Sequence, residues 1–205
     1  MDAFEEVVAS IMQRQGYWTL TSVKVELTKA DKRAIGRPSS PRWELDIVAY
    51  RGRDNELRVV ECKSFLDSLG VRCDAFNGTN APAARRYKLF CDATLRRVVL
   101  RRLKQQLVKA GFCQEKPTVR LCLAAGKIHG DEAWLRNHFE ERSWVLMGPE
   151  LIREELRALR DSGYQNSVAA VVTKLLLRKA RGGKARGRGG GFVKQQAVHF
   201  REVEP

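Results

Sequence analysis

Two strand-like segments joined by a short turn constrain the fold of this chain more than any other feature of its sequence. Residues 42–50 (RWELDIVAY) and 57–63 (LRVVECK) are rich in β-branched and other apolar residues, and the RGRDNE between them contains the Gly and Asp-Asn of a turn. Together these segments predict a β-hairpin. Polar residues interrupt both predicted strands.

Helical and strand-like patterns alternate along the rest of the chain. Asp92 is a good N-cap for a helix with apolar residues from Leu95 to Leu107, and residues 117–126 form an almost continuous apolar run, typical of a strand buried on both faces. The expected helices cover residues 4–16, 92–111, 131–142, 149–163 and 168–177, and the further strands cover residues 17–27, 117–126 and 143–147. This order predicts an α/β domain with a mixed central sheet flanked by helices.

Three segments lack a helical or strand-like pattern. Residues 28–41 contain the Gly, Pro and Ser of a mobile, basic loop, and residues 64–91 form an irregular region for which substrate recognition or partner contact is our hypothesis. Residues 178–205 begin with alternating Gly, Arg and Lys, a composition typical of a disordered basic tail. The expected organisation is one domain over residues 1–177 and a Gly/Arg-rich tail over residues 178–205.

The charge of the chain indicates a polyanionic partner. Its 38 Lys and Arg residues against 24 Asp and Glu residues give a formal net charge of +14, an excess that attracts nucleic acid. One basic group precedes the hairpin, another follows it on the polar face of a helix, and we expect both to contact phosphates. The expected nucleic-acid-binding residues are Lys32, Arg33, Arg37, Arg42, Arg97, Arg101 and Lys104. For any one of them, an ordinary solvated side chain is the alternative.

The cysteines and the N-terminal residues bear on the compartment. The five cysteines are an odd number without a CxxC pair, which indicates reduced thiols. The N-terminal MDAFEEVVAS opens with acids rather than with the basic region of a secretory signal. No apolar run approaches the roughly 20 residues of a membrane-spanning helix. We therefore expect a cytoplasmic protein with no membrane partner.

Asp46, Glu61 and Lys63 are three of the polar residues that interrupt the two predicted strands. Because successive side chains of a strand alternate between faces, Glu61 and Lys63 emerge on one face while Val60 and Cys62 point to the other. Asp46 lies among apolar residues, where an ionised carboxylate costs several kcal/mol unless a positive partner lies next to it. A divalent metal is one such partner.

A carboxylate on each of two neighbouring strands is typical of a hard-oxygen metal site. Asp46, Glu61 and the backbone carbonyl of Cys62 suit Mg²⁺ or Mn²⁺. Such a metal activates water and neutralises the charge that develops on a phosphodiester, and Lys63 beside it would serve the nucleophile. The alternative is a structural ion pair of Asp46, Glu61 and Lys63 on a sheet edge, because an ExK pattern is common by chance.

These residues resemble a known motif. The sequence WELDIVAY, followed one hairpin later by VVECK and preceded by a helix with a glutamate, is similar to the PD-(D/E)xK nuclease superfamily, and within it to the archaeal Holliday junction resolvases and the Mrr-like restriction endonucleases. The resemblance covers about residues 4–126 and implies a restriction endonuclease-like αβββαβ core. Leu45 stands where the motif name has proline, a departure of little consequence because that proline is not a ligand.

The resemblance implies a role for each matching residue. Asp46 and Glu61 match the metal-binding carboxylates, Lys63 matches the catalytic lysine, and Glu5 matches the first-helix glutamate that helps the metal site. Glu5 borders the apolar stripe of its helix whereas Glu6 points away from it, so helix geometry favours Glu5. The alternative is that both acids simply stabilise the N-terminus of the helix.

The expected function is that of a metal-dependent endonuclease that hydrolyses phosphodiester bonds in DNA. Two other classes stay open. One is a non-catalytic nucleic-acid-binding protein, and the other is the nuclease subunit of a larger defence or mobile-element complex that acts only with partner proteins. Because cleavage of paired strands requires two active sites, a homodimer is a further hypothesis.

Overall fold

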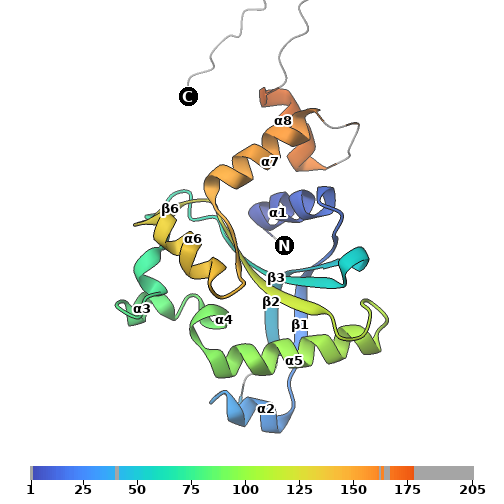
Figure 1. Cartoon of the computed structure of the whole chain (residues 1–205), viewed down its shortest axis with the longest axis vertical. Helices are drawn as coiled ribbons and strands as arrows, with labels where there is room; N and C mark the ends of the chain where they lie inside the picture. The colour runs from blue at the N-terminus through green and yellow to red at the C-terminus, as the bar shows by residue number, and fades with distance from the viewer. Residues whose placement is uncertain (1, 40–41, 162, 164–166, 178–205) are drawn as a thin grey trace, which may run out of the picture.

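A mixed five-stranded sheet forms the centre of the computed structural model, which describes residues 2–39, 42–161, 163 and 167–177. Its strands lie in the order β1-β2-β3-β5-β7 (Figure 1). They are β1 (Trp18–Glu26), β2 (Arg42–Arg51), β3 (Glu56–Lys63), β5 (Thr118–Ala125) and β7 (Val145–Met147). The first three strands are antiparallel neighbours, whereas β5 pairs parallel with β3 and β7 pairs parallel with β5. The expected α/β class, mixed sheet and hairpin are confirmed.

Helices surround this sheet and account for most of the remaining described residues. They are α1 (Ala3–Arg14), α2 (Lys29–Ala34), α3 (Ala81–Ala84), α4 (Lys88–Cys91), α5 (Ala93–Lys109), α6 (Glu132–Glu140), α7 (Pro149–Asp161) and α8 (Val168–Leu177), with the 3-10 turns η1 (Gly52–Asp54) and η2 (Cys73–Ala75). As expected, the side chain of Asp92 caps α5, accepting a hydrogen bond from the Leu95 N–H. The expected tail, residues 178–205, lies outside the described residues.

The two faces of the sheet carry separate hydrophobic clusters. α1 covers one face, where Val8 and Ile11 pack with residues of β2 and β3, and α5 covers the other, where Val99 and Leu103 are fully buried (Figure 1). α7 and α8 pack against the outer side of α1. β5 lies between β3 and β7 and is buried on both faces, as its continuous apolar run indicated.

Residues 28–41 were expected to form a loop, and for residues 29–34 this prediction is wrong. They form α2, which begins with a capping box: the Thr28 hydroxyl accepts from the Asp31 N–H, and the Asp31 carboxylate accepts from the Thr28 N–H. Asp31 is buried and also accepts hydrogen bonds from Arg101 and Arg102 of α5, at 2.6 and 2.5 Å. These long-range ion pairs stabilise a helix that the Gly and Pro content of the segment disfavours.

Residues 64–91 form short elements rather than one irregular region. β4 (Val71–Arg72) pairs parallel with β6 (Ile128–His129) in a second small sheet, and η2, α3 and α4 follow β4 along the chain. α4 and α5 are neighbours on the same side of the main sheet (Figure 1). The segment therefore lies beside the end of β3, where Glu61 and Lys63 are.

The last described helix, α8, buries small residues and leaves large apolar residues exposed. Its small residues Ala169 and Ala170 are buried, whereas the side chains of Leu175 and Leu176 are each 77% exposed. No helix within the described residues has the length and apolar character needed to cross a membrane.

Replacing Asp31 with alanine is expected to lower the free energy of unfolding by about 2 kcal/mol, because Arg101, Arg102 and Thr28 lose a shared charged acceptor. Urea denaturation at pH 7 measures this change. The matched control is Asp67→Ala, which removes an exposed aspartate. Equal stability of the two variants would contradict the prediction.

The same group predicts a pH dependence. Burial alone raises the pKa of Asp31, but hydrogen bonds from Thr28 and Arg102 outweigh it and lower the pKa to about 2. The stabilisation is therefore complete above the ordinary aspartate range and is lost as the pH falls towards 2. In Asp31→Ala the unfolding free energy should depend less steeply on pH between about 4 and 2.

Candidate active site

The alternation of side chains along β2 breaks at Asp46. Leu45 and Val48 belong to the hydrophobic cluster on the α5 side of the sheet, although they are three residues apart, whereas Ile47 lies in the cluster on the α1 side. The neighbouring strand β1 is distorted at the same level, where Ser22 has a φ of +51°, in the left-handed region. Because of this break, Asp46 belongs to neither hydrophobic cluster.

The Asp46 carboxylate points towards β3. Its Oδ2 accepts a hydrogen bond of 2.7 Å from the backbone N–H of Cys62, just beyond the Ile47–Val60 pair that ends the antiparallel ladder. The side chain thus takes the place of a backbone acceptor at the point where β2 and β3 diverge. This bond orients the carboxylate and joins it to the Glu61–Lys63 segment.

Glu61 and Lys63 project together from the end of β3, as the strand alternation predicted. They lie on the α5 side, with Val59, while Val60 and Cys62 lie on the α1 side. Lys63 Nζ and Glu61 Oε1 are 3.1 Å apart, and their side chains are 23% and 16% exposed. The structure therefore contains the Glu61–Lys63 part of the ion pair of the alternative interpretation, in the central strand of the sheet rather than on its edge. An ion pair alone does not exclude a catalytic role.

Burial and charge shift the pKa values of this pair. Burial raises the pKa of Glu61, an effect only partly opposed by the Lys63 ammonium. Burial lowers the pKa of Lys63, but the carboxylates of Glu61 and Asp46 outweigh it, so its pKa is raised. Lys63 therefore stays an ammonium at neutral pH, whereas Glu61 takes up a proton more readily than an ordinary glutamate.

Asp46, Glu61 and Lys63 line one cavity of about 250 Å³. The other residues in its wall are Trp43, Glu44, Leu45, Val60, Arg85, Arg86, Lys88 and Leu89. The wall of this cavity thus contains four basic and three acidic side chains. Within the described residues, Arg85, Arg86 and Lys88 form no side-chain ion pair or hydrogen bond. Such basic groups are suited to bind an anion.

Arg85, Arg86 and Lys88 were missed by the sequence analysis. They come from the RRYK sequence of residues 85–88, within the segment to which substrate recognition was assigned only as a whole. The signal available was this local run of basic residues. Its proximity to Asp46 depends on the packing of α4 beside β3, which sequence periodicity does not reveal.

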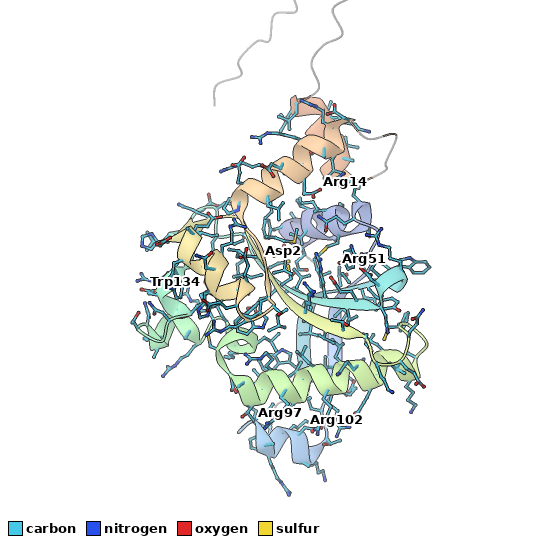
Figure 2. All side chains as sticks on the ribbon, viewed as in Figure 1. Asp2, Arg14, Arg51, Arg97, Arg102 and Trp134 are labelled. Atoms are coloured by element: carbon cyan, nitrogen blue, oxygen red, sulfur yellow. The ribbon has the colours of Figure 1, made fainter. Side chains whose placement is uncertain are left out.

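Glu5 lies apart from this cavity. It belongs to α1, on the opposite side of the sheet from Glu61, and its carboxylate accepts from the Asp2 N–H in a capping box (Figure 2 labels Asp2). Burial raises the pKa of Glu5, and the carboxylates of Asp2 and Asp46 contribute to the rise. Glu5 is thus close enough to Asp46 to sense its charge while serving the helix N-terminus, as the alternative interpretation held.

The donor set fits a hard divalent cation. Asp46 and Glu61 bring two carboxylates to one cavity, and Mg²⁺ is commonly held by one or two carboxylates together with water and phosphate oxygens. Across residues 2–39, 42–161, 163 and 167–177, no group of three or more His, Cys, Asp or Glu side chains is arranged to hold a metal. Burial raises the pKa of the Cys62 thiol, so Cys62 would contribute its carbonyl and not its sulfur.

All five cysteines are free thiols, as their odd number and spacing indicated. Four of them are buried, and Cys91 is exposed.

The seven expected nucleic-acid-binding residues divide into two groups. Arg42 pairs with Glu26 and Arg101 pairs with Asp31, while the Arg37 guanidinium lies over the Trp43 ring, 5.4 Å from its centre. The other four, Lys32, Arg33, Arg97 and Lys104, form no ion pair with the described residues. Figure 2 shows Arg97 on the side of α5 that faces α2. The basic residues of the 28–41 segment and those of α5 therefore lie next to each other.

Comparison with known proteins assigns no function to this site. No protein-family model and no curated protein matches the chain. Among solved structures, the crystal structure of AF1548, a protein of unknown function, is similar to 73% of this chain at 20% sequence identity, with a TM-score of 0.38. The chain spans 63% of the length of that protein.

Replacing Lys63 with alanine is expected to raise the pKa of Glu61 further, because burial persists while the neighbouring ammonium is lost. Carboxyl NMR titration measures the change, with Glu61→Gln identifying the resonance. Lys24→Ala, which removes an exposed lysine from β1, is the control and should leave the titration unchanged. An identical Glu61 titration in wild type and Lys63→Ala would show that the two groups do not interact in solution.

Proposed function

We propose that this chain is a metal-dependent nuclease that hydrolyses phosphodiester bonds in DNA. The observation that carries the proposal is the shared cavity, in which Asp46, Glu61 and Lys63 face the basic side chains of Arg85, Arg86 and Lys88. Two carboxylates suit a divalent cation, and the surrounding cations suit the phosphates of a nucleic acid. The net charge of +14 supports the same substrate class.

Each residue has a distinct task in this proposal. Asp46 and Glu61 would hold Mg²⁺ or Mn²⁺, which when bound supplies Lewis-acid chemistry at the phosphate. The Cys62 N–H keeps Asp46 oriented towards that position. Lys63 is an ammonium at neutral pH, because Glu61 and Asp46 raise its pKa, and so it would orient the nucleophile and stabilise negative charge rather than accept a proton.

The finer identity of the fold is part of the same proposal. The order α1, β1, β2, β3, α5, β5 supports a restriction endonuclease-like αβββαβ core of the PD-(D/E)xK superfamily. The only role that this proposal gives to Glu5 is its electrostatic interaction with Asp46.

A non-catalytic DNA-binding protein is the second candidate. The ion pair of Glu61 and Lys63 favours it, because each charge already has a partner without a metal. The homodimer, the requirement for partner proteins, and the cytoplasmic location stay predictions, and the molecular mass in solution tests the first of them.

The central test of the proposal is cleavage of labelled linear duplex, single-stranded and four-way-junction DNA with Mg²⁺ or Mn²⁺. We expect Asp46→Asn and Lys63→Ala each to lower the cleavage rate about a hundredfold or more. The asparagine keeps an acceptor for the Cys62 N–H, so the loss reports charge and not misfolding. Glu44→Gln, an exposed residue in the wall of the same cavity, is the control and should keep the wild-type rate.

Two outcomes would count against this function. Metal-dependent cleavage that survives both Asp46→Asn and Lys63→Ala would place the chemistry elsewhere. DNA binding without cleavage at any metal concentration would favour the binding-only candidate or a nuclease that needs a partner.

Arg85 is expected to bind a phosphate. Arg85→Ala should weaken DNA binding equally for different base sequences and should reduce the slope of log affinity against log salt by about one. Fluorescence anisotropy at several salt concentrations in metal-free buffer measures both quantities. Arg53→Ala, an exposed arginine in the turn at the opposite end of β3, is the matched control. Equal slopes for the two variants would remove Arg85 from the interface.

A further inference from the structure

A second cavity, of about 380 Å³, adjoins the candidate active site. Its wall comes from the segment between β3 and α4 and consists of Ser68, Leu69, Gly70, Arg72, Asn80, Pro82, Ala83, Arg86 and Tyr87. Arg86 lines this cavity as well as the cavity that contains Asp46 and Glu61. The walls of the two cavities therefore share one arginine.

The wall of the second cavity is held in place before any ligand binds. The Lys127 ammonium donates to the Ser68 carbonyl at 2.7 Å, and the Val71 N–H donates to the Lys127 carbonyl at 2.8 Å. Gly70 has a φ of +105°, and a Cβ there would lie 2.9 Å from the Lys127 carbonyl oxygen, so only glycine fits. This close approach fixes the loop that begins directly after Lys63.

The polar side chains of the cavity are also ordered by contacts. Arg72 Nε donates to Asp74 Oδ1 at 3.0 Å, and Asn80 Nδ2 donates to Asp74 Oδ2 at 3.2 Å. Tyr87 is 1% exposed, so its ring is part of a rigid wall. Accessible apolar surface from Leu69 and Pro82 is thus combined with fixed polar groups, as in pockets that bind small molecules.

We propose that this second cavity takes the base of an unpaired nucleotide adjacent to the phosphodiester bound in the cavity that Asp46, Glu61 and Arg86 line. The inference rests on the proposed function and extends it, because it names DNA with unpaired nucleotides as the substrate class. Arg86 bridges the base and the backbone phosphate, which matches the alternation of flat apolar rings and anionic groups along a nucleic acid strand. An unpaired base enters such a pocket with the smallest loss of stacking and pairing energy.

Leu69 is an exposed apolar residue of the wall. Its side chain is 61% exposed, and it follows the active-site lysine by only six positions in the chain. Leu66, in the same loop, is 62% exposed and does not line the cavity. Because the two leucines are matched in type, exposure and loop, they form a controlled pair of substitutions.

The test is the binding of the full chain to fluorescently labelled duplex DNA with one unpaired 2-aminopurine, compared with the same duplex fully paired, in metal-free buffer with EDTA. We expect the wild type to bind the duplex with the unpaired base about tenfold more tightly. Leu69→Ala should lose most of this preference and Leu66→Ala should keep it. Ala83→Phe, which fills the cavity from α3, should abolish the preference while leaving affinity for paired duplex unchanged.

The result that would overturn the inference is equal affinity of the wild type for the two duplexes, including the absence of binding to either. Equal effects of Leu69→Ala and Leu66→Ala on the preference would overturn it as well. Because binding is measured without metal, the outcome is independent of cleavage. Metal-dependent cleavage without a preference for the unpaired base would leave the nuclease proposal intact and remove this one. A Leu69-dependent preference without cleavage would support the base-binding cavity and count against a nuclease that acts without partner proteins.

Discussion

The hydrogen bond from the Cys62 N–H to the Asp46 carboxylate is the contact on which the candidate site depends. It forms where β2 and β3 begin to diverge, and it holds an acidic side chain in a position that a regular ladder would give to a backbone carbonyl. The break in alternation along β2 makes this possible, because a strictly alternating strand would direct Asp46 into one of the two apolar clusters. A local defect in the sheet thus provides the space for polar chemistry at the end of an otherwise apolar hairpin.

The two glutamates of β3 show why a three-residue motif does not define a site. Glu56 and Arg58 have the same spacing as Glu61 and Lys63, yet Glu56 accepts hydrogen bonds of 2.6 Å from both the Tyr17 hydroxyl and Arg58. Burial raises the pKa of Glu56, but these contacts outweigh it, so its pKa is lowered. For Glu61, burial prevails over Lys63 and the pKa is raised. The contacts of Glu56 therefore outweigh its burial, whereas the burial of Glu61 is offset only in part by Lys63.

The sequence predicted the elements whose residues repeat with a clear period, and it failed where distant residues decide the structure. The hairpin, the Asp92-capped helix and the buried β5 follow from local patterns of apolar and capping residues. α2 could not be predicted in this way, because Asp31 pairs with arginines 70 and 71 positions away. The carboxylates and the lysine of the site were found because strand geometry brings together residues on neighbouring strands. The basic wall of the cavity was missed because α4 reaches β3 only through tertiary packing.

The acidic residues of the cavity are the strongest physical argument for chemistry over simple binding. A surface that only bound a polyanion would gain affinity by losing Asp46 and Glu61, since both carboxylates repel phosphate and one of them is largely buried. Their presence beside Arg85, Arg86 and Lys88 is unfavourable for binding alone and becomes favourable when a divalent cation lies between carboxylate and phosphate. The same two carboxylates explain why Lys63 stays charged, because Glu61 and Asp46 together raise the pKa of its ammonium.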